Sequence, residues 1–179
     1  MRPARLFAKP VDPYAYDIVQ SMFVETLQQR VRLVRARSFA GLMTVYESNH
    51  ARMKQLLGEL GRIPEHAVSR SPTDLSLHLS VQERSRYTTV MQMTYWFDSA
   101  EGSVADPDLS VRIYHDARLV EAVDCAGNPR HAVLQPLWRP ARSELEQRWT
   151  LNIMLNKWLE FCLDNRHVFP HVPGPITRR

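Results

Sequence analysis

Alternating apolar and polar residues along two stretches of the chain restrict its fold more than any other feature. In residues 75–82, leucine or valine occupies every second position, and residues 109–123 hold two further alternating segments. Period-two alternation predicts strands that bury one face and expose the other. The sequence therefore predicts a sheet that is covered on one side.

Four strands are predicted in this region, and short links join them. They cover about residues 75–82, 87–97, 109–115 and 118–125. Short links between successive strands favour an antiparallel meander over parallel crossovers. Residues 98–107 are expected to form a mobile loop, and a short additional strand at 131–135 is left open.

Helices are predicted before and after the strands. Apolar residues spaced three or four apart predict one helix over about 14–35 and a second over about 39–61. A capping box at Ser143–Glu146 predicts the start of a third, which ends near Asn165. The predicted fold class is α+β, a four-stranded antiparallel β-meander packed against N-terminal and C-terminal helices.

Charge and proline content divide the chain. Residues 1–37 contain seven Lys or Arg against three acids, whereas the rest of the chain contains sixteen of each. We expect a basic N-terminal extension at 1–37 with an amphipathic helix, a single α+β domain at 38–167 and a Pro-rich tail at 168–179. Through residues 14–37 the extension would contact a protein partner, or it is a solvated arm.

Several functional classes are disfavoured by what the sequence lacks. Cys125 and Cys162 lie far apart without a zinc-ligand or disulfide pattern. The sequence contains no membrane-spanning apolar run, no secretory leader, no phosphate-binding glycine loop and no nucleophile elbow. We expect a soluble cytoplasmic protein with no metal and no cofactor. Nucleic acid is an unlikely partner because the body of the chain is neutral.

The two turns of the meander form the candidate site. In an up-and-down meander, the first-to-second and third-to-fourth turns lie at the same end of the sheet. This arrangement brings together Glu83, Arg84, Arg86, Tyr87, His115, Asp116 and Arg118. All but Arg84 are ligand-binding candidates: Arg86 and Arg118 would bind an anion through their guanidinium forks, while Tyr87 and His115 would orient it.

Two alternatives remain for this cluster. Glu83 with Arg86, and Asp116 with His115 or Arg118, would form cross-strand charge pairs that stabilise the strand register. As an enzyme, the cluster would use His115 and Asp116 to hydrolyse a phosphorylated metabolite. No catalytic residue is assigned, because the sequence shows no complete catalytic or metal-ligand set.

Glu47 and Asn49 are secondary candidates on the second predicted helix. Asn49 interrupts the apolar stripe of that helix. A buried amide needs hydrogen-bond partners, so Asn49 either braces a neighbouring segment or faces a ligand.

Four strings along the chain resemble the YqiB-like family of bacterial proteins, a domain of unknown function. They are Tyr46-Glu-Ser-Asn49, Glu83-Arg-Ser-Arg-Tyr-Thr-Thr89, Val111-Arg-Ile-Tyr-His-Asp-Ala117 and Trp158-Leu-Glu-Phe-Cys-Leu163. The resemblance covers about residues 39–167. It implies a small cytoplasmic proteobacterial protein and supplies no catalytic residues.

The expected function is that of a non-enzymatic binding or regulatory protein which recognises a small anionic ligand, for example a nucleotide. The alternatives are the hydrolase that uses His115 and Asp116 and an interaction module that acts through residues 14–37.

Overall fold

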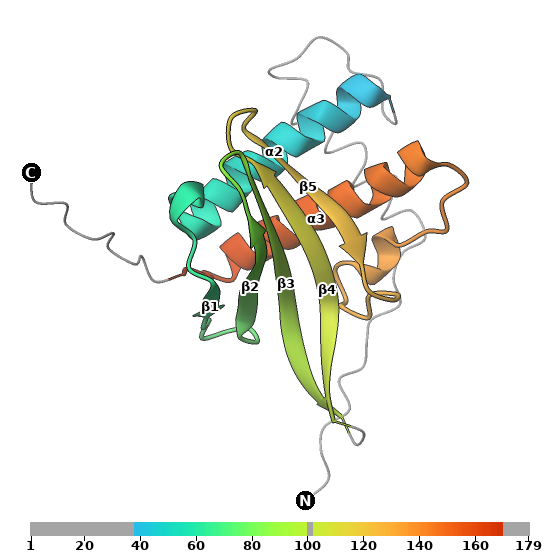
Figure 1. The fold of residues 1–179 in the computed structure, drawn as a ribbon. Helices are drawn as coiled ribbons and strands as arrows, with labels where there is room; N and C mark the ends of the chain where they lie inside the picture. The colour runs from blue at the N-terminus through green and yellow to red at the C-terminus, as the bar shows by residue number, and fades with distance from the viewer. Residues whose placement is uncertain (1–37, 100–101, 170–179) are drawn as a thin grey trace, which may run out of the picture.

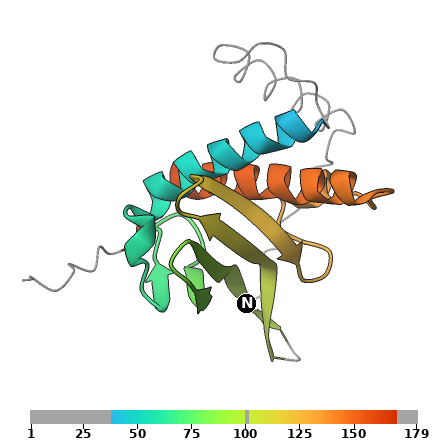
Figure 2. The ribbon, with the colours of Figure 1, turned by 45° about the horizontal axis from the view of Figure 1, so that its top comes forward.

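Two long helices cover one face of a five-stranded sheet in the computed structural model, which describes residues 38–99 and 102–169 (Figure 1). Helix α2 spans Phe39–Leu57 and helix α3 spans Glu144–Asp164. The two helices lie side by side on the same side of the sheet (Figure 2). The helix expected at 14–35 lies outside the described residues.

The sheet is an antiparallel meander, as predicted, but it has five strands and not four. The strands follow one another in space as they do in the chain: β1 (His66–Ser69), β2 (Leu77–Arg84), β3 (Thr88–Ser99), β4 (Gly102–Tyr114) and β5 (Leu119–Cys125). The prediction missed β1, where Ser69 is the one buried residue of four. So short a strand, which buries a serine, shows no period-two apolar pattern.

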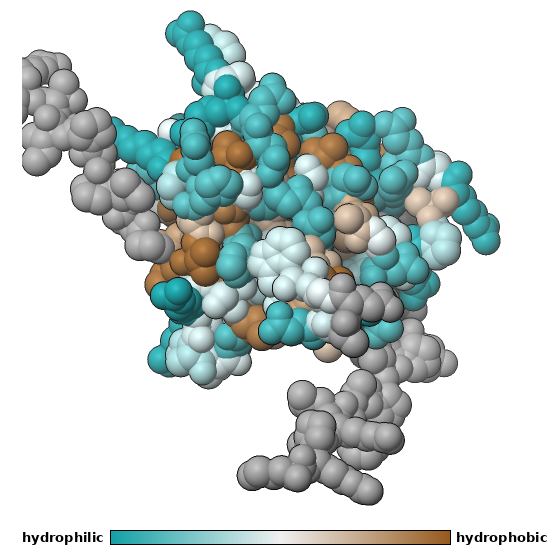
Figure 3. Space-filling model, turned by 60° about the horizontal axis from the view of Figure 1, so that its bottom comes forward, coloured by the Kyte–Doolittle hydropathy of each residue, from teal (hydrophilic) through white to brown (hydrophobic). Residues whose placement is uncertain are grey.

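The prediction of a mobile loop at 98–107 was also wrong. Strand β3 extends to Ser99 and β4 begins at Gly102, and the two are paired here, with Phe97 opposite Val104 and Asp98 opposite Ser103. Backbone pairing extends the strands although the local composition is typical of a loop. In Figure 3, which looks toward the hairpin end of the molecule, hydrophobic residues are interspersed with hydrophilic ones.

The segment between β5 and α3 contains turns and the short helix η2 (Gln135–Leu137), so no strand forms at 131–135. Helix α3 begins at the predicted capping box, where the Glu146 amide donates to Ser143 Oγ at 3.2 Å. The Glu146 side chain accepts from the Arg142 amide at 2.9 Å. The side-chain cap therefore occupies the start of α3 that the sequence predicts.

The hydrophobic core lies between the sheet and the two helices. Alternate residues of β2, β3 and β4 point into it, as the period-two pattern predicts. Strand β5 contributes Val120, Ala122 and Cys125 without a regular alternation of burial. Trp158 of α3 packs edge-on against Tyr95 of β3 with ring centroids 5.5 Å apart, and both are fully buried. Burial of a large apolar side chain contributes about 1.5–3 kcal/mol, so this interface holds the helices against the sheet.

Buried asparagines join the helices to the free edge of β5. The Ala122 amide donates to Asn152 Oδ1 at 2.8 Å, and Asn152 Nδ2 donates back to the Ala122 carbonyl at 3.2 Å. Asn49 Nδ2 lies 3.4 Å from the Val120 carbonyl. The asparagine side chains thus form hydrogen bonds with the β5 backbone groups that a further strand would otherwise pair with. They fix α2 relative to β5, and hence relative to the turn that precedes it.

In the described part of the chain, no helix has the length and apolar character needed to cross a lipid bilayer.

Candidate functional site

A pocket of about 670 Å³ opens where the β2–β3 and β4–β5 turns meet the C-terminal half of α2. Both turns lie at the same end of the sheet, beside α2 (Figure 1). The His115 amide in the second turn donates to the Tyr87 carbonyl in the first at 2.9 Å. This bond joins the two turns directly, so the meander brings them together as the sequence predicts.

The β4–β5 turn supplies His115 and Arg118 to the pocket. His115 Nε2 lies 2.9 Å from Thr89 Oγ1 on the neighbouring strand, which orients the ring. Arg118 has a φ of 56°, the left-handed conformation that closes the turn. A residue with a side chain is disfavoured in this conformation, and a glycine would adopt it more readily.

The end of β2 supplies Arg84, and the β2–β3 turn supplies Ser85 and Arg86. Ser85 Oγ accepts from the Thr88 amide at 3.0 Å, which closes the turn. Arg84 donates to the Ile63 carbonyl, and this bond fixes part of its guanidinium. The Arg86 guanidinium lies over the Tyr87 ring, 5.1 Å from its centroid. Tyr87 is half exposed beside the pocket, where its ring limits the positions open to Arg86.

Helix α2 and the segment after it form the third wall. His50 and Lys54 lie one helical turn apart on α2, and Glu59 and Gly61 follow the helix. Burial lowers the pKa of His50, and the nearby charges of Lys54, Arg118 and His115 lower it further. The His50 imidazole is therefore neutral at neutral pH.

The pocket is strongly cationic. Its cationic lining residues are Lys54, Arg84, Arg86 and Arg118, and among the described residues Glu59 is the one carboxylate that lines it. No ion pair of these four cationic side chains is found within residues 38–99 and 102–169. Unpaired guanidinium and ammonium groups that face one cavity repel one another and favour an anion there.

The predicted site residues separate into two groups. Arg86, His115 and Arg118 line the pocket, and Tyr87 lies against Arg86. Glu83 and Asp116 are exposed and do not line it. Among the described residues, Glu83 forms no charge pair with Arg86, and Asp116 forms none with His115 or Arg118.

The secondary candidates lie away from the cavity. Glu47 is exposed on α2 and does not line the pocket. Asn49 is fully buried, and its Oδ1 accepts from Asn156 Nδ2 at 2.8 Å. Both the nitrogen and the oxygen of the Asn49 side chain are thus hydrogen-bonded to protein groups. The geometry supports the bracing role for Asn49 over contact with a ligand.

Sequence analysis missed His50, Lys54 and Glu59. The i, i+4 spacing of His50 and Lys54 places both on one helix face, which is a usable signal. That signal does not reveal that this face meets the two turns, because the packing angle of α2 on the sheet depends on contacts distant in sequence.

A Ser–His–Asp arrangement occurs elsewhere in the fold but is closed to solvent. Ser69 Oγ lies 3.1 Å from His167 Nδ1, and His167 Nε2 lies 3.1 Å from Asp74 Oδ2. Ser69 and His167 are 0% and 1% exposed. A nucleophile must reach its substrate, so this cluster instead attaches the chain after α3 to β1 and to the β1–β2 connection.

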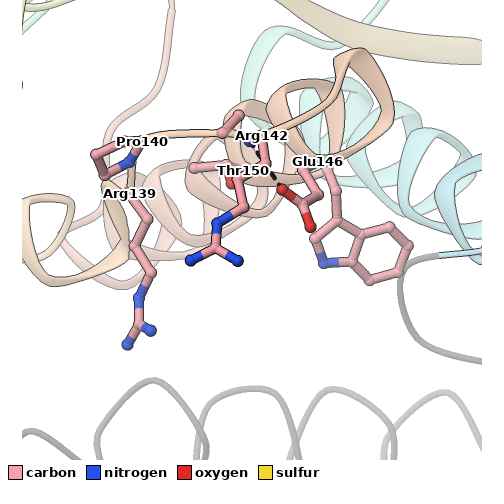
Figure 4. Close-up of a pocket in the computed structure, with 7 residues that line it drawn as sticks. Arg139, Pro140, Arg142, Glu146 and Thr150 are labelled. Atoms are coloured by element: carbon pink, nitrogen blue, oxygen red, sulfur yellow. Dashed lines mark hydrogen bonds between the residues drawn. The ribbon is translucent and has the colours of Figure 1, made fainter.

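A second, smaller pocket of about 270 Å³ lies at the start of α3. In Figure 4 the side chains of Arg139 and Arg142 point the same way, and a dashed line marks the bond from the Arg142 amide to Glu146. The Glu146 carboxylate also lines this pocket. With two arginines against one carboxylate, this pocket is less positive than the one beside α2, where four cationic side chains line the cavity with Glu59.

Comparison with known proteins identifies the family. The family described as "Protein of unknown function (DUF1249)" matches residues 52–168, which include both turns, β1 to β5 and α3. The chain belongs to this family. This match, together with the relatives named YqiB that follow, confirms the resemblance to the YqiB-like family predicted from the four strings.

Relatives of this DUF1249 protein include the "Uncharacterized protein YqiB" of Escherichia coli strains K12, CFT073 and O157:H7. Each is 24% identical over 132 residues, an alignment that covers 70% of this chain and 88% of the relative. No solved structure gives a significant match.

Proposed function

We propose that this DUF1249 protein binds a small anionic ligand with a phosphate group in the pocket between α2 and the two turns. One observation carries the proposal. Lys54, Arg84, Arg86 and Arg118 come from three separate segments and line one cavity, where Glu59 is the one carboxylate found in the described part of the chain. Arginine forks bind phosphate oxygens in pairs, and lysine adds a point charge.

The size and openness of the site fit a small molecule. The volume of about 670 Å³ lies within the range of small-molecule sites. Tyr87 is half exposed beside Arg86 and offers an aromatic surface at the rim. A nucleotide is one ligand that would use both features, with its phosphate among the cations and its base on the ring.

The geometry favours binding over hydrolysis. A hydrolase built on His115 and Asp116 needs both groups to reach the substrate. Asp116 does not line the pocket, and Nε2 of His115 is bonded to Thr89 Oγ1. The arrangement therefore supports a binding or regulatory protein. If the protein released phosphate from a ligand that it binds, the binding proposal would be wrong and the protein would be a hydrolase.

A thermal-shift experiment tests the proposal with inorganic phosphate, pyrophosphate and adenine nucleotides. A ligand that binds only the folded state stabilises it and so raises the Tm. At a ligand concentration of 100 times the Kd, the stabilisation is about 2.7 kcal/mol. We expect at least one of these probes to raise the Tm of the full chain.

Arg118→Gly is the sharpest variant, because it removes a guanidinium from a residue whose left-handed backbone favours glycine. We expect this protein to remain folded and to bind the probe about tenfold more weakly, as loss of one charge-assisted bond implies. Arg130→Ala, which removes an arginine from outside the pocket, should bind as the wild type does. Equal binding by Arg118→Gly and the wild type, or no response to any probe, refutes the proposal.

A further inference from the structure

We propose that His50 takes up a proton when the pocket binds its anion, so that the site prefers dianions and binds them more tightly as the pH falls. This inference rests on the anion-binding role proposed above. It adds a histidine to a site whose other cationic side chains are those of one lysine and three arginines.

The position of His50 makes it responsive to whatever fills the pocket. The ring lines the cavity from α2, with Lys54 one turn further along the same helix. Arg118 and His115 face it from the β4–β5 turn. The remaining charged residues that line the cavity are Arg84 from the end of β2, Arg86 from the β2–β3 turn and Glu59 from the segment after α2.

In the empty pocket these neighbours oppose a charge on His50. Its pKa is lowered by burial and by the positive charges of Lys54, Arg118 and His115. A neutral imidazole has one donor nitrogen and one acceptor nitrogen. An acceptor nitrogen that faces an anion is repelled by it, whereas the imidazolium ion donates from both nitrogens.

A bound dianion reverses this balance. An opposite charge within about 4–6 Å favours the charged form and moves a pKa by about one unit or more. The free energy that raises the pKa of His50 also tightens the binding of the anion, because the two equilibria are linked. Binding is therefore accompanied by proton uptake. The affinity rises as the pH falls through the window between the pKa of His50 in the anion-bound protein and its pKa in the free protein.

His50 is better placed for this role than the other histidine of the pocket. Nε2 of His115 is bonded to Thr89 Oγ1, which leaves only one of its nitrogens for a ligand. His50 forms no hydrogen bond within the described part of the chain. Among these residues, therefore, no hydrogen bond of the His50 ring has to break before the ring binds a ligand.

Sulfate is a suitable probe because it is a tetrahedral dianion that does not titrate between pH 5 and pH 8. Any proton taken up on binding then belongs to the protein. We would follow the histidine rings of the full chain by ¹H–¹⁵N NMR in sodium sulfate and in sodium chloride of matched ionic strength. His78, on the polar face of β2, serves as the internal control.

We expect His50 to remain protonated to a higher pH in sulfate than in chloride, with no difference for His78. The affinity for sulfate should rise roughly tenfold over the window, as a change of one unit in a single pKa implies. His50→Gln keeps a donor and an acceptor but cannot take up the proton. We expect this variant to bind sulfate and to lose most of the rise.

Two results overturn the inference, and they are distinguishable. If pocket amides respond to sulfate while His50 titrates alike in both salts, His50 is not the proton acceptor and the anion site stands. If neither sulfate nor pyrophosphate perturbs the pocket amides, the proposed function fails as well.

Discussion

Asn152→Ala should destabilise the protein strongly, because the Asn152 side chain forms hydrogen bonds with two backbone groups at the free edge of β5. Asn152 is fully buried between α3 and the sheet. Its Oδ1 accepts from the Ala122 amide at 2.8 Å, and its Nδ2 donates to the carbonyls of Ala122 at 3.2 Å and Arg148 at 2.8 Å. Truncation leaves the Ala122 amide and carbonyl without these partners.

The expected magnitude follows from those two backbone groups. A buried polar group that loses its partner costs about 1–3 kcal/mol, so the two together cost about 2–6 kcal/mol. A domain of this size has about 5–15 kcal/mol of total stability, so the variant should lose a large share of it. We would measure urea-induced unfolding by tryptophan fluorescence, since Trp149 and Trp158 on the same helix are buried.

Asn156→Ala is the matched control, one turn further along α3. Asn156 is equally buried and donates to Ser48 Oγ at 3.0 Å and Asn49 Oδ1 at 2.8 Å. Within the described residues, its side chain donates to no strand backbone, and its own Oδ1 has no hydrogen-bond partner. Truncation removes the Nδ2 donor from one fully buried acceptor, Asn49 Oδ1, so we expect a loss of about 1–3 kcal/mol, half of that expected for Asn152→Ala. Equal losses for the two variants, or less than about 1 kcal/mol for Asn152→Ala, would refute the role assigned to the β5 edge.

Three further predictions concern titratable groups. Burial raises the pKa of Cys125 to about 11 and that of Cys162 to about 12. In the folded chain, Cys125 should therefore react with a thiol reagent about a hundredfold more slowly than in the unfolded chain, and Cys162 about a thousandfold more slowly. Burial lowers the pKa values of His50 and His131. The unfolded chain therefore binds more protons than the folded chain below about pH 7. The urea concentration at the unfolding midpoint should decrease as the pH is lowered from about 7 to about 5, and the decrease should be smaller for His50→Gln. Glu121→Gln removes a buried carboxylate shared by two half-exposed arginines and should cost about 1–2 kcal/mol by the same unfolding assay.

The strand order and the pairing of the turns were predictable because they depend on local patterns. Alternation over 75–82 and 109–123 sets which residues face the core, and short links force successive strands to be neighbours. The proximity of Arg86, His115 and Arg118 follows from that topology alone. No knowledge of helix packing is needed to place them at one end of the sheet.

Other features depended on interactions that no local pattern records. Strand β1 forms because His66–Ser69 pairs with β2, although three of its four residues are not buried. The β3–β4 hairpin continues to Ser99 through residues that favour loops when considered alone. In both cases backbone hydrogen bonds to a neighbouring strand override composition.

The sequence by itself determined an antiparallel meander, two amphipathic helices with a capped start at Ser143, and a cationic pair of turns. Only the tertiary structure decided that the His50 and Lys54 face of α2 would close those turns into a pocket, and that Glu83 and Asp116 would stay outside it. The reason is physical. Periodicity encodes which face of an element is buried, whereas the angle at which a helix crosses a sheet is set by side-chain packing and by bonds such as those of Asn49 and Asn152 to β5.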